Sequence, residues 1–122
     1  MLAERPVVQA QLAEADAALR AARAFVLEAV EEAWQAATGE GRLEVRHRAL
    51  LRLAATHATL ASARTVDLMY NAGGGTAVYA TSPLQRCFRD IHVATQHMLV
   101  APATLELSGR ILLGLETDTA ML

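Results

Sequence analysis

The sequence predicts an all-α protein, a four-helix, mostly antiparallel bundle that forms a single domain over residues 1–122. Apolar residues make up 53% of the chain, with many Ala and Leu among them, whereas aromatic residues make up only 4%. This mixture favours closely packed helices over a sheet. Apolar residues also recur at steps of three and four along two long segments, which is the helical period. The length suffices for one domain with a modest core.

The first helix is expected over residues 6–38. Pro6 suits its first turn, where the missing N–H costs nothing. Trp34 widens the apolar face and is expected to fill an interface rather than to stack on a ligand. Two glycines in the segment Thr38-Gly39-Glu40-Gly41 are expected to supply a left-handed cap and a turn. The apolar seam in steps of four and three is Val8, Leu12, Ala15, Leu19, Ala22, Val26, Ala29 and Ala33.

The second helix is expected over residues 43–72, antiparallel to the first. Its seam is rich in alanine, which allows a close approach of the two helices. Neither His47 nor His57 has a second His, Cys or carboxylate three or four residues further along the helix, so no metal site is predicted. The helix is locally basic, and a solvated or subunit-facing side is favoured over a ligand site. The basic residues are Arg46, Arg48, Arg52 and Arg64.

The third and fourth helices are expected over residues 83–98 and 102–113, followed by a frayed tail over 115–122. Ser82 is the predicted N-cap of the third helix, with Pro83 in its first turn. Arg86 and Asp90 are four residues apart and can pair along it. Cys87 is expected to be buried. The residues expected to face inward from the fourth helix are Leu105, Gly109 and Leu112.

The glycine run Gly73-Gly74-Gly75 has two interpretations. It can be the end of the second helix followed by a loop, because glycine tolerates turns that other residues avoid. It can also be a backbone surface that approaches a phosphate or pyrophosphate closely. Three glycines alone do not decide between these two.

Composition excludes several classes of partner. The formal net charge of −2 provides no electrostatic reason to expect nucleic acid or an anionic membrane. No apolar run approaches the roughly 20 residues that span a bilayer, and the N-terminus lacks the pattern of a signal peptide. The single cysteine cannot form an internal disulfide and fits a reducing compartment. We therefore expect a cytoplasmic protein without nucleic-acid or membrane partners.

The stretch from Tyr70 to His97 concentrates the unusual residues of the chain. Asn71-x-x-Gly74-Gly75 ends the second helix, and Arg86-x-x-Arg89-Asp90 lies on the third. This arrangement resembles the C-terminal domain of the acyl-CoA dehydrogenase superfamily, in which a Gln-x-x-Gly-Gly helix end precedes a helix with an Arg-x-x-Arg-Asp core. The resemblance extends over nearly the whole chain. It covers one of the family's three domains, without the N-terminal helical domain and the middle β-domain.

The chain departs from the dehydrogenases at the expected catalytic base. Where many of them carry a Glu in a Tyr-Glu-Gly-Thr motif, this sequence has His97-Met98-Leu99-Val100, and Met98 cannot abstract an α-proton. The pattern is more similar to the branch of two-component flavin-dependent monooxygenases. That likeness implies a catalytic role for His97 near the flavin ring, in orienting or deprotonating a phenolic or heteroaromatic substrate, or in hydrogen bonding to a flavin hydroperoxide. His92 is a weaker candidate.

The resemblance also implies a cofactor, FAD or FMN, and partners. The Gly-Gly turn would approach the flavin of a neighbouring subunit, in a homo-oligomer that is a dimer or tetramer. A flavin reductase, or a chain with the missing domains, would be a further partner. Arg89 and Asp90 can equally be structural, tying their helix to its neighbours. The implied cofactor-binding residues are Asn71, Gly74, Gly75 and Arg89.

The implied function is that of the C-terminal helical domain of a flavin-dependent monooxygenase or hydroxylase acting on an aromatic substrate. The domain would contribute to flavin binding and oligomerisation and would be inactive as the isolated 122-residue chain. Two alternatives remain open. One is an acyl-CoA dehydrogenase domain that lacks the usual Glu base, and the other is a non-enzymatic oligomerising bundle.

Overall fold

The computed structural model describes residues 1–39 and 41–122 and contains no strand within them. Its four α-helices are α1 (Pro6–Thr38), α2 (Val45–Gly73), α3 (Pro83–Ala94) and α4 (Ala103–Leu112). Three short 3₁₀ helices accompany them, η1 (Leu2–Glu4), η2 (Gly74–Val78) and η3 (Met98–Val100). The predicted all-α, four-helix class is confirmed.

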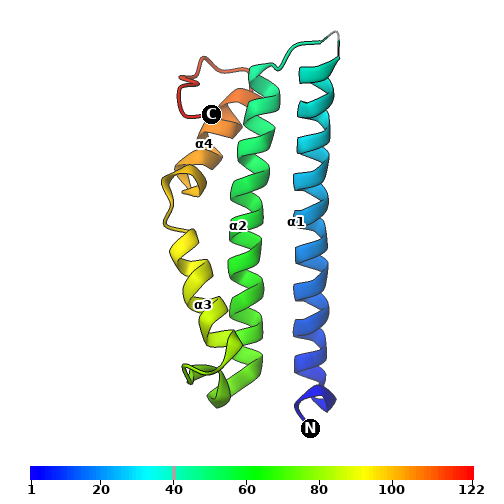
Figure 1. The fold of residues 1–122 in the computed structure, drawn as a ribbon, viewed down its shortest axis with the longest axis vertical. Coiled ribbons are helices and arrows are strands. Elements are labelled where there is room, and N and C mark those ends of the chain that lie inside the picture. The colour runs from blue at the N-terminus through cyan, green and yellow to red at the C-terminus, as the bar shows by residue number, and fades with distance from the viewer. Residues whose placement is uncertain (40) are drawn as a thin grey trace.

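The helix α2 is the centre of the molecule. It runs antiparallel to α1, and α3 and α4 follow one another end to end along its other side (Figure 1). Among the described residues, α2 is the one α-helix that contacts the other three, and α1 contacts no α-helix besides α2. The bundle is therefore three helical columns side by side, with the third column interrupted between α3 and α4.

The interface between α1 and α2 is built from alanine. Ala15, Ala22 and Ala29 are buried at intervals of seven residues, and Ala33 extends this stripe by one turn. Small side chains let two helices approach closely, so the alanines of the predicted seam are buried as expected. Leu12 and Leu19 of the same predicted seam are 58% and 42% exposed. They lie beside the narrow contact stripe, because α2 covers only the alanine face.

The hairpin between α1 and α2 differs from the prediction in its cap. Gly39 ends α1, and its N–H donates to the carbonyl oxygen of Gln35. Its backbone is extended, with φ of −87° and ψ of −166°, rather than left-handed. Glu40 of the predicted turn lies outside the described residues. The second helix begins at Val45 and ends at Gly73, close to the predicted 43–72.

The third helix ends four residues before the predicted boundary of 98. The Thr95 hydroxyl donates to the carbonyl oxygen of His92. The N–H groups of Gln96 and His97 donate to carbonyls three residues back, which tightens the last turn and ends the helix. The chain then passes through η3 into α4, whose bounds lie within one residue of the predicted 102–113. The segment His97–Val100 is therefore a connection between helices, not part of one.

The tail over 115–122, predicted to be frayed, folds back beside α4 and the start of α2 (Figure 1). The Arg48 guanidinium donates to the carbonyl oxygens of Thr119 and Leu122, over 3.3 Å and 3.1 Å. A side chain from the second helix therefore anchors the tail. No helix within the described residues is both long and apolar enough to cross a membrane.

Two further predictions of burial are wrong. Cys87 is exposed, because α3 packs only on α2 and η2 and none of its residues is fully buried. The inward residues of α4 are Thr104 and Ser108, whereas Leu105 and Leu112 are exposed. The predicted face of α4 is displaced by one residue, because the hydroxyl groups of α4 find partners on α2.

Candidate functional site

His97 lies in the connection between α3 and α4 and is the N-cap residue of η3. Its ring is exposed, and Nδ1 accepts a hydrogen bond from the Leu99 N–H over 3.2 Å. A ring nitrogen that accepts a hydrogen bond carries no proton, so the proton of the neutral imidazole is on Nε2. His97 therefore presents an Nε2–H donor to its surroundings.

An apolar hollow of about 410 Å³ lies next to His97, between η3, α4 and the tail. Met98 and Leu99, the two residues that follow His97, form one wall, and Met121 of the tail belongs to its lining. Asp118 is the one carboxylate on its surface among the described residues. Met98, which the resemblance aligns with the dehydrogenase base, contributes a thioether to this wall, and a thioether neither accepts nor releases a proton at neutral pH.

The three glycines at the end of α2 have three different environments. A Cβ on Gly73 would lie 2.7 Å from Cδ1 of Leu84, so a larger residue here would force the Leu84 side chain to shift at the contact between α2 and α3. Gly74 has φ of +59° and ψ of −143°, a conformation that residues with a side chain rarely adopt. A Cβ on Gly75 would meet no atom within 4 Å. No intramolecular contact among the described residues therefore requires glycine at position 75.

The other predicted cofactor-binding residues face solvent. Asn71 is exposed and makes no side-chain hydrogen bond within the described part of the chain. Arg89 is exposed on α3 and has no ion pair among those residues. Asp90 instead pairs with Arg86 over 3.5 Å, as the spacing predicts. Both Asn71 and Arg89 are thus available to a group outside the chain.

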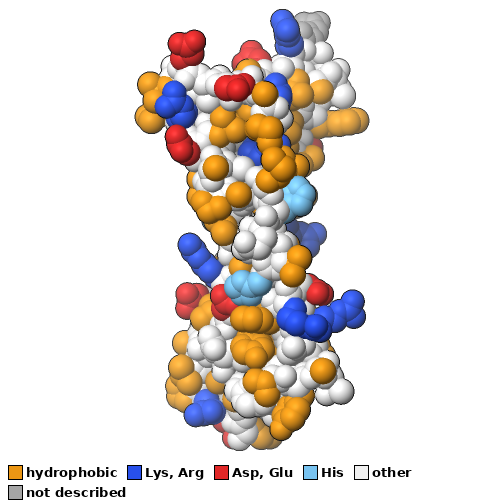
Figure 2. Space-filling view, turned by 90° about the vertical axis from the view of Figure 1, so that its left-hand side faces the viewer, with side chains coloured by type: hydrophobic (Ala, Val, Ile, Leu, Met, Phe, Trp, Pro, Cys, Tyr) orange, Lys and Arg blue, Asp and Glu red, His pale blue; other side chains and the backbone are white. Residues whose placement is uncertain are grey.

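The structure does not bring the predicted site residues into one pocket. Asn71, Gly74 and Gly75 lie before α3, and His97 lies after it. A helix of 12 residues is roughly 18 Å long. The face formed by α3 and α4 has a narrow waist, with histidine side chains at or near it and hydrophobic side chains gathered above and below (Figure 2). Within this chain, the glycine turn and His97 can contact only separate parts of a ligand.

A side-chain cluster between α2 and α3 was missed from the sequence. His92 Nε2 lies 2.7 Å from Oδ1 of Asp67, and both side chains are 42% exposed. The rings of Phe88 and His92 have centroids 4.5 Å apart, and Phe88 packs equally close to Tyr70. This cluster ties α3 to α2. A signal was present, since Asp67 is the single acidic residue between Glu44 and Asp90.

The described residues contain no group of three or more His, Cys, Asp or Glu side chains that could hold a metal ion. His47 has Glu44 three residues before it, and His57 lines a hollow together with Glu14, so each has one carboxylate nearby. The Nδ1 of His47 accepts from the Glu44 N–H over 3.0 Å, and the His57 ring packs edge-on against Phe25. Both histidines therefore have local structural contacts.

Comparison with known proteins identifies relatives over most of the chain. It is 39% identical over 113 residues to an indole-3-acetate monooxygenase of Pseudomonas putida, which covers 93% of this chain and 29% of that protein. It is 32% identical over 120 residues to the oxygenase component of an FADH₂-dependent resorcinol hydroxylase of a Rhizobium species, covering 94% and 29%. The chain thus spans less than a third of the length of these relatives.

Solved structures have the same fold. The crystal structure of a 3-HSA hydroxylase from Rhodococcus sp. RHA1 superposes with a TM-score of 0.89 at 26% identity, over 98% of this chain and 32% of that one. The HsaA monooxygenase from M. tuberculosis superposes with a TM-score of 0.86, also at 26% identity, over 94% and 31%. A family profile described as the acyl-CoA dehydrogenase C-terminal domain matches residues 1–102. The chain therefore belongs to the family of acyl-CoA dehydrogenase C-terminal domains.

Proposed function

We propose that this chain is the C-terminal helical domain of a flavin-dependent monooxygenase that acts on an aromatic substrate. The observation that carries the proposal is the environment of His97, which presents an exposed Nε2–H donor beside Met98, the residue that the resemblance aligns with the carboxylate base. The relatives named for their reactions are a monooxygenase of indole-3-acetate and a hydroxylase of resorcinol. Both are named for aromatic compounds.

The tautomer of His97 favours one of the roles open to it. Because Nδ1 accepts from Leu99, Nε2 already carries the ring proton and cannot take another from a phenol while that hydrogen bond persists. In this conformation His97 donates from Nε2 to an oxygen atom of the substrate or of the cofactor. A donor aimed at an oxygen on which negative charge develops stabilises the transition state.

We propose that Gly75, together with Asn71 and Arg89, contacts a flavin that other chains help to bind. The surface at Gly75 is open, so a flat or phosphate-bearing group can approach the backbone closely. Asn71 and Arg89 are both exposed and carry hydrogen-bond donors for ring or phosphate oxygens. Bound reduced flavin would supply the electrons that activate dioxygen.

Reduced FAD is the proposed form of the cofactor, since one relative is named as FADH₂-dependent. The same relative is named as an oxygenase component, which supports a separate reductase as the source of reduced flavin. A homo-oligomer, a dimer or tetramer, would supply the rest of the site. The dehydrogenase alternative is less favoured, because Met98 occupies the position of the base.

The experiment is an equilibrium titration of the purified chain with FAD and FMN, each oxidised and reduced. The expected result is saturable binding that is tighter for reduced FAD than for reduced FMN. Gly75→Val should weaken it at least about tenfold, because a branched side chain would occupy the open surface (1.4 kcal/mol per tenfold).

Gly109→Val is the matched control, since Gly109 on α4 also has no atom within 4 Å of a built Cβ. If Gly75→Val and Gly109→Val bind flavin with equal dissociation constants, the glycine turn is not part of the flavin site. An absence of saturable binding by the unmodified chain would mean that it holds no flavin on its own. The oligomerising-bundle alternative would then be the better description.

A further inference from the structure

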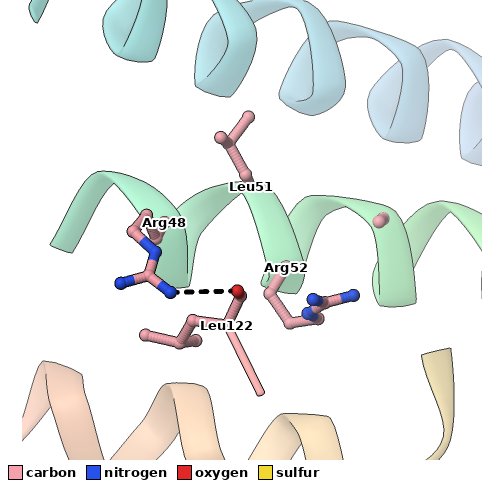
Figure 3. A pocket seen from close by; sticks show the side chains of 5 residues that line it. Arg48, Leu51, Arg52 and Leu122 are labelled. Atoms are coloured by element: carbon pink, nitrogen blue, oxygen red, sulfur yellow. Dashed lines mark hydrogen bonds between the residues drawn. The ribbon is translucent and has the colours of Figure 1, made fainter. Parts of the chain in front are cut away.

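Arg52 connects the central helix to the segment that holds His97. It lies on α2 beside Arg48, and both line a hollow of about 270 Å³ with Leu51, Ala55 and Leu122 (Figure 3). In Figure 3 the Arg48 guanidinium points to Leu122 of the tail, whereas the Arg52 guanidinium points away from it. Arg52 Nη1 donates instead to the carbonyl oxygen of Leu99, over 3.1 Å. The two arginines therefore anchor different segments.

The bond from Arg52 continues through one peptide group to His97. The carbonyl of Leu99 and the N–H of Val100 belong to the same peptide, and this N–H donates to the carbonyl oxygen of His97 over 3.0 Å. A hydrogen bond on one side of a peptide polarises it and strengthens the bond on the other side. Leu99 itself donates its N–H to Nδ1 of His97. Leu99 is thus held by Arg52 and in turn holds the His97 ring.

The segment depends on this support because η3 is weak by itself. It has three residues, and a single 3₁₀ turn has poorer hydrogen-bond geometry than an α-helix. Its closing bond, from the Ala101 N–H to the Met98 carbonyl oxygen, is long at 3.4 Å. Arg52 supplies the one side-chain hydrogen bond from α2 to η3 among the described residues. Its donor is charged, and such bonds are stronger than neutral ones.

Arg52 has no competing carboxylate partner in the described part of the chain. Its Nε is buried and has no hydrogen-bond partner there. The side chain therefore lies partly buried with the Leu99 carbonyl as its one protein acceptor among these residues. An arginine that is merely solvated needs neither a partly buried position nor a fixed acceptor. Arg46 on the same helix is an example, since its side chain is exposed.

We propose that Arg52 is a positioning residue for His97, acting through Leu99 to keep Nδ1 an acceptor and the Nε2–H directed outward. The functional meaning of this role rests on the proposed function of His97. The hydrogen-bond relay itself does not depend on flavin.

The test is nuclear magnetic resonance of the imidazole nitrogens at alkaline pH, where histidines are neutral. The chain contains two internal references. His47 accepts at Nδ1 from the Glu44 N–H, and His57 makes no hydrogen bond among the described residues. In the unmodified chain, His97 should match His47, with a coupling across the hydrogen bond from the Leu99 amide to Nδ1.

Arg52→Met should shift the His97 nitrogen signals toward those of His57, remove the coupling and leave His47 unchanged. The Leu99 and Val100 amides should exchange with solvent about tenfold faster. Arg52→Lys retains a charged donor and should restore part of the coupling. Arg46→Met is the control, because Arg46 is exposed on the same helix.

The proposal is overturned if Arg52→Met leaves the His97 signals in place, or if Arg46→Met shifts them equally. It is also overturned if the unmodified chain shows no coupling from Leu99 to His97. If Arg52→Met does not fold, Arg52→Lys decides instead. A coupling from Leu99 to His97 that is as strong in Arg52→Lys as in the unmodified chain would contradict the proposal, and a weaker coupling would support it. A chain that binds no flavin would contradict the proposed function. It would not affect the conclusion that Arg52 positions His97.

Discussion

At the scale of single residues, neighbouring glycines at the end of α2 differ in whether the structure requires a residue without a side chain. The resemblance pairs Gly74 with Gly75 as equivalent cofactor contacts. In the structure, Gly74 is required by its positive φ, whereas Gly75 has neither a strained backbone nor a close neighbour among the described residues. Substitution at Gly75 therefore separates a binding role from a folding role, and substitution at Gly74 does not.

Gly74→Ala should lower the free energy of unfolding by about 1–3 kcal/mol, the usual cost of forcing a side chain into this backbone region. Gly75→Ala should change it by less than about 0.5 kcal/mol, as for a typical surface substitution. Urea denaturation followed by circular dichroism measures both. Equal destabilisation by the two alanines would contradict the assigned backbone conformations.

At the scale of helices, α4 is attached to α2 by polar groups. The hydroxyls of Thr56 and Thr104 lie 2.6 Å apart and are buried. Thr104 donates its hydroxyl proton to the carbonyl oxygen of Ala101, so Thr56 is the donor between the two. Ser108 donates to the Ala49 carbonyl oxygen at the next turn, over 3.5 Å. Hydrogen bonds therefore fix the position of α4 along α2 where the apolar pattern does not.

These donor roles predict an asymmetry between two otherwise similar substitutions. Thr104→Val removes the acceptor and leaves the fully buried Thr56 hydroxyl without this partner, at a cost of about 1–3 kcal/mol. Thr56→Val leaves Thr104 bonded to Ala101 and should cost less than about 1 kcal/mol.

Thermal or urea unfolding of both single variants and the double variant would measure the difference. The double variant should be no less stable than Thr104→Val alone, because the orphaned hydroxyl is then gone. If Thr56→Val proves the more damaging substitution, the assigned direction of the hydrogen bond is wrong.

At the scale of the whole molecule, α1 has a second apolar face that α2 leaves uncovered. At 3.6 residues per turn, this face lies about 90° from the buried alanine stripe. Asp16 and Arg23 interrupt it with charges of opposite sign. Trp34 lies at the C-terminal end of this face and is 66% exposed. The exposed apolar residues are Leu12, Leu19, Leu27, Val30 and Trp34. Such a surface commonly marks a protein contact.

This surface leads to a prediction about assembly. The chain should self-associate, as a dimer or tetramer, and Leu27→Glu should weaken association at least about tenfold by placing a charge in the contact (1.4 kcal/mol per tenfold). Analytical ultracentrifugation over a range of concentrations measures this. Ala17→Glu is the control, since it adds the same charge at an exposed position on another side of α1. A monomeric chain, or equal effects of both variants, would reject this face as the contact between copies.

The sequence by itself determined the features that depend on near neighbours. Helical period, Pro83 and the glycines at the helix ends predicted four helices and most of their bounds. The end of α3 was wrong because it depends on the hydroxyl of Thr95 rather than on a glycine or proline. The likeness over the stretch from Tyr70 to His97 identified the family, because a motif is itself a local pattern.

Only the tertiary structure decided which distant residues meet. Asp67 and His92 are 25 positions apart, Arg52 and Leu99 are 47, and Thr56 and Thr104 are 48. Periodicity relates residues within about two turns of one helix and contains no information on which turn of a second helix lies opposite. The arginine that holds the His97 segment therefore looked like an ordinary surface charge until α2 and η3 were placed side by side.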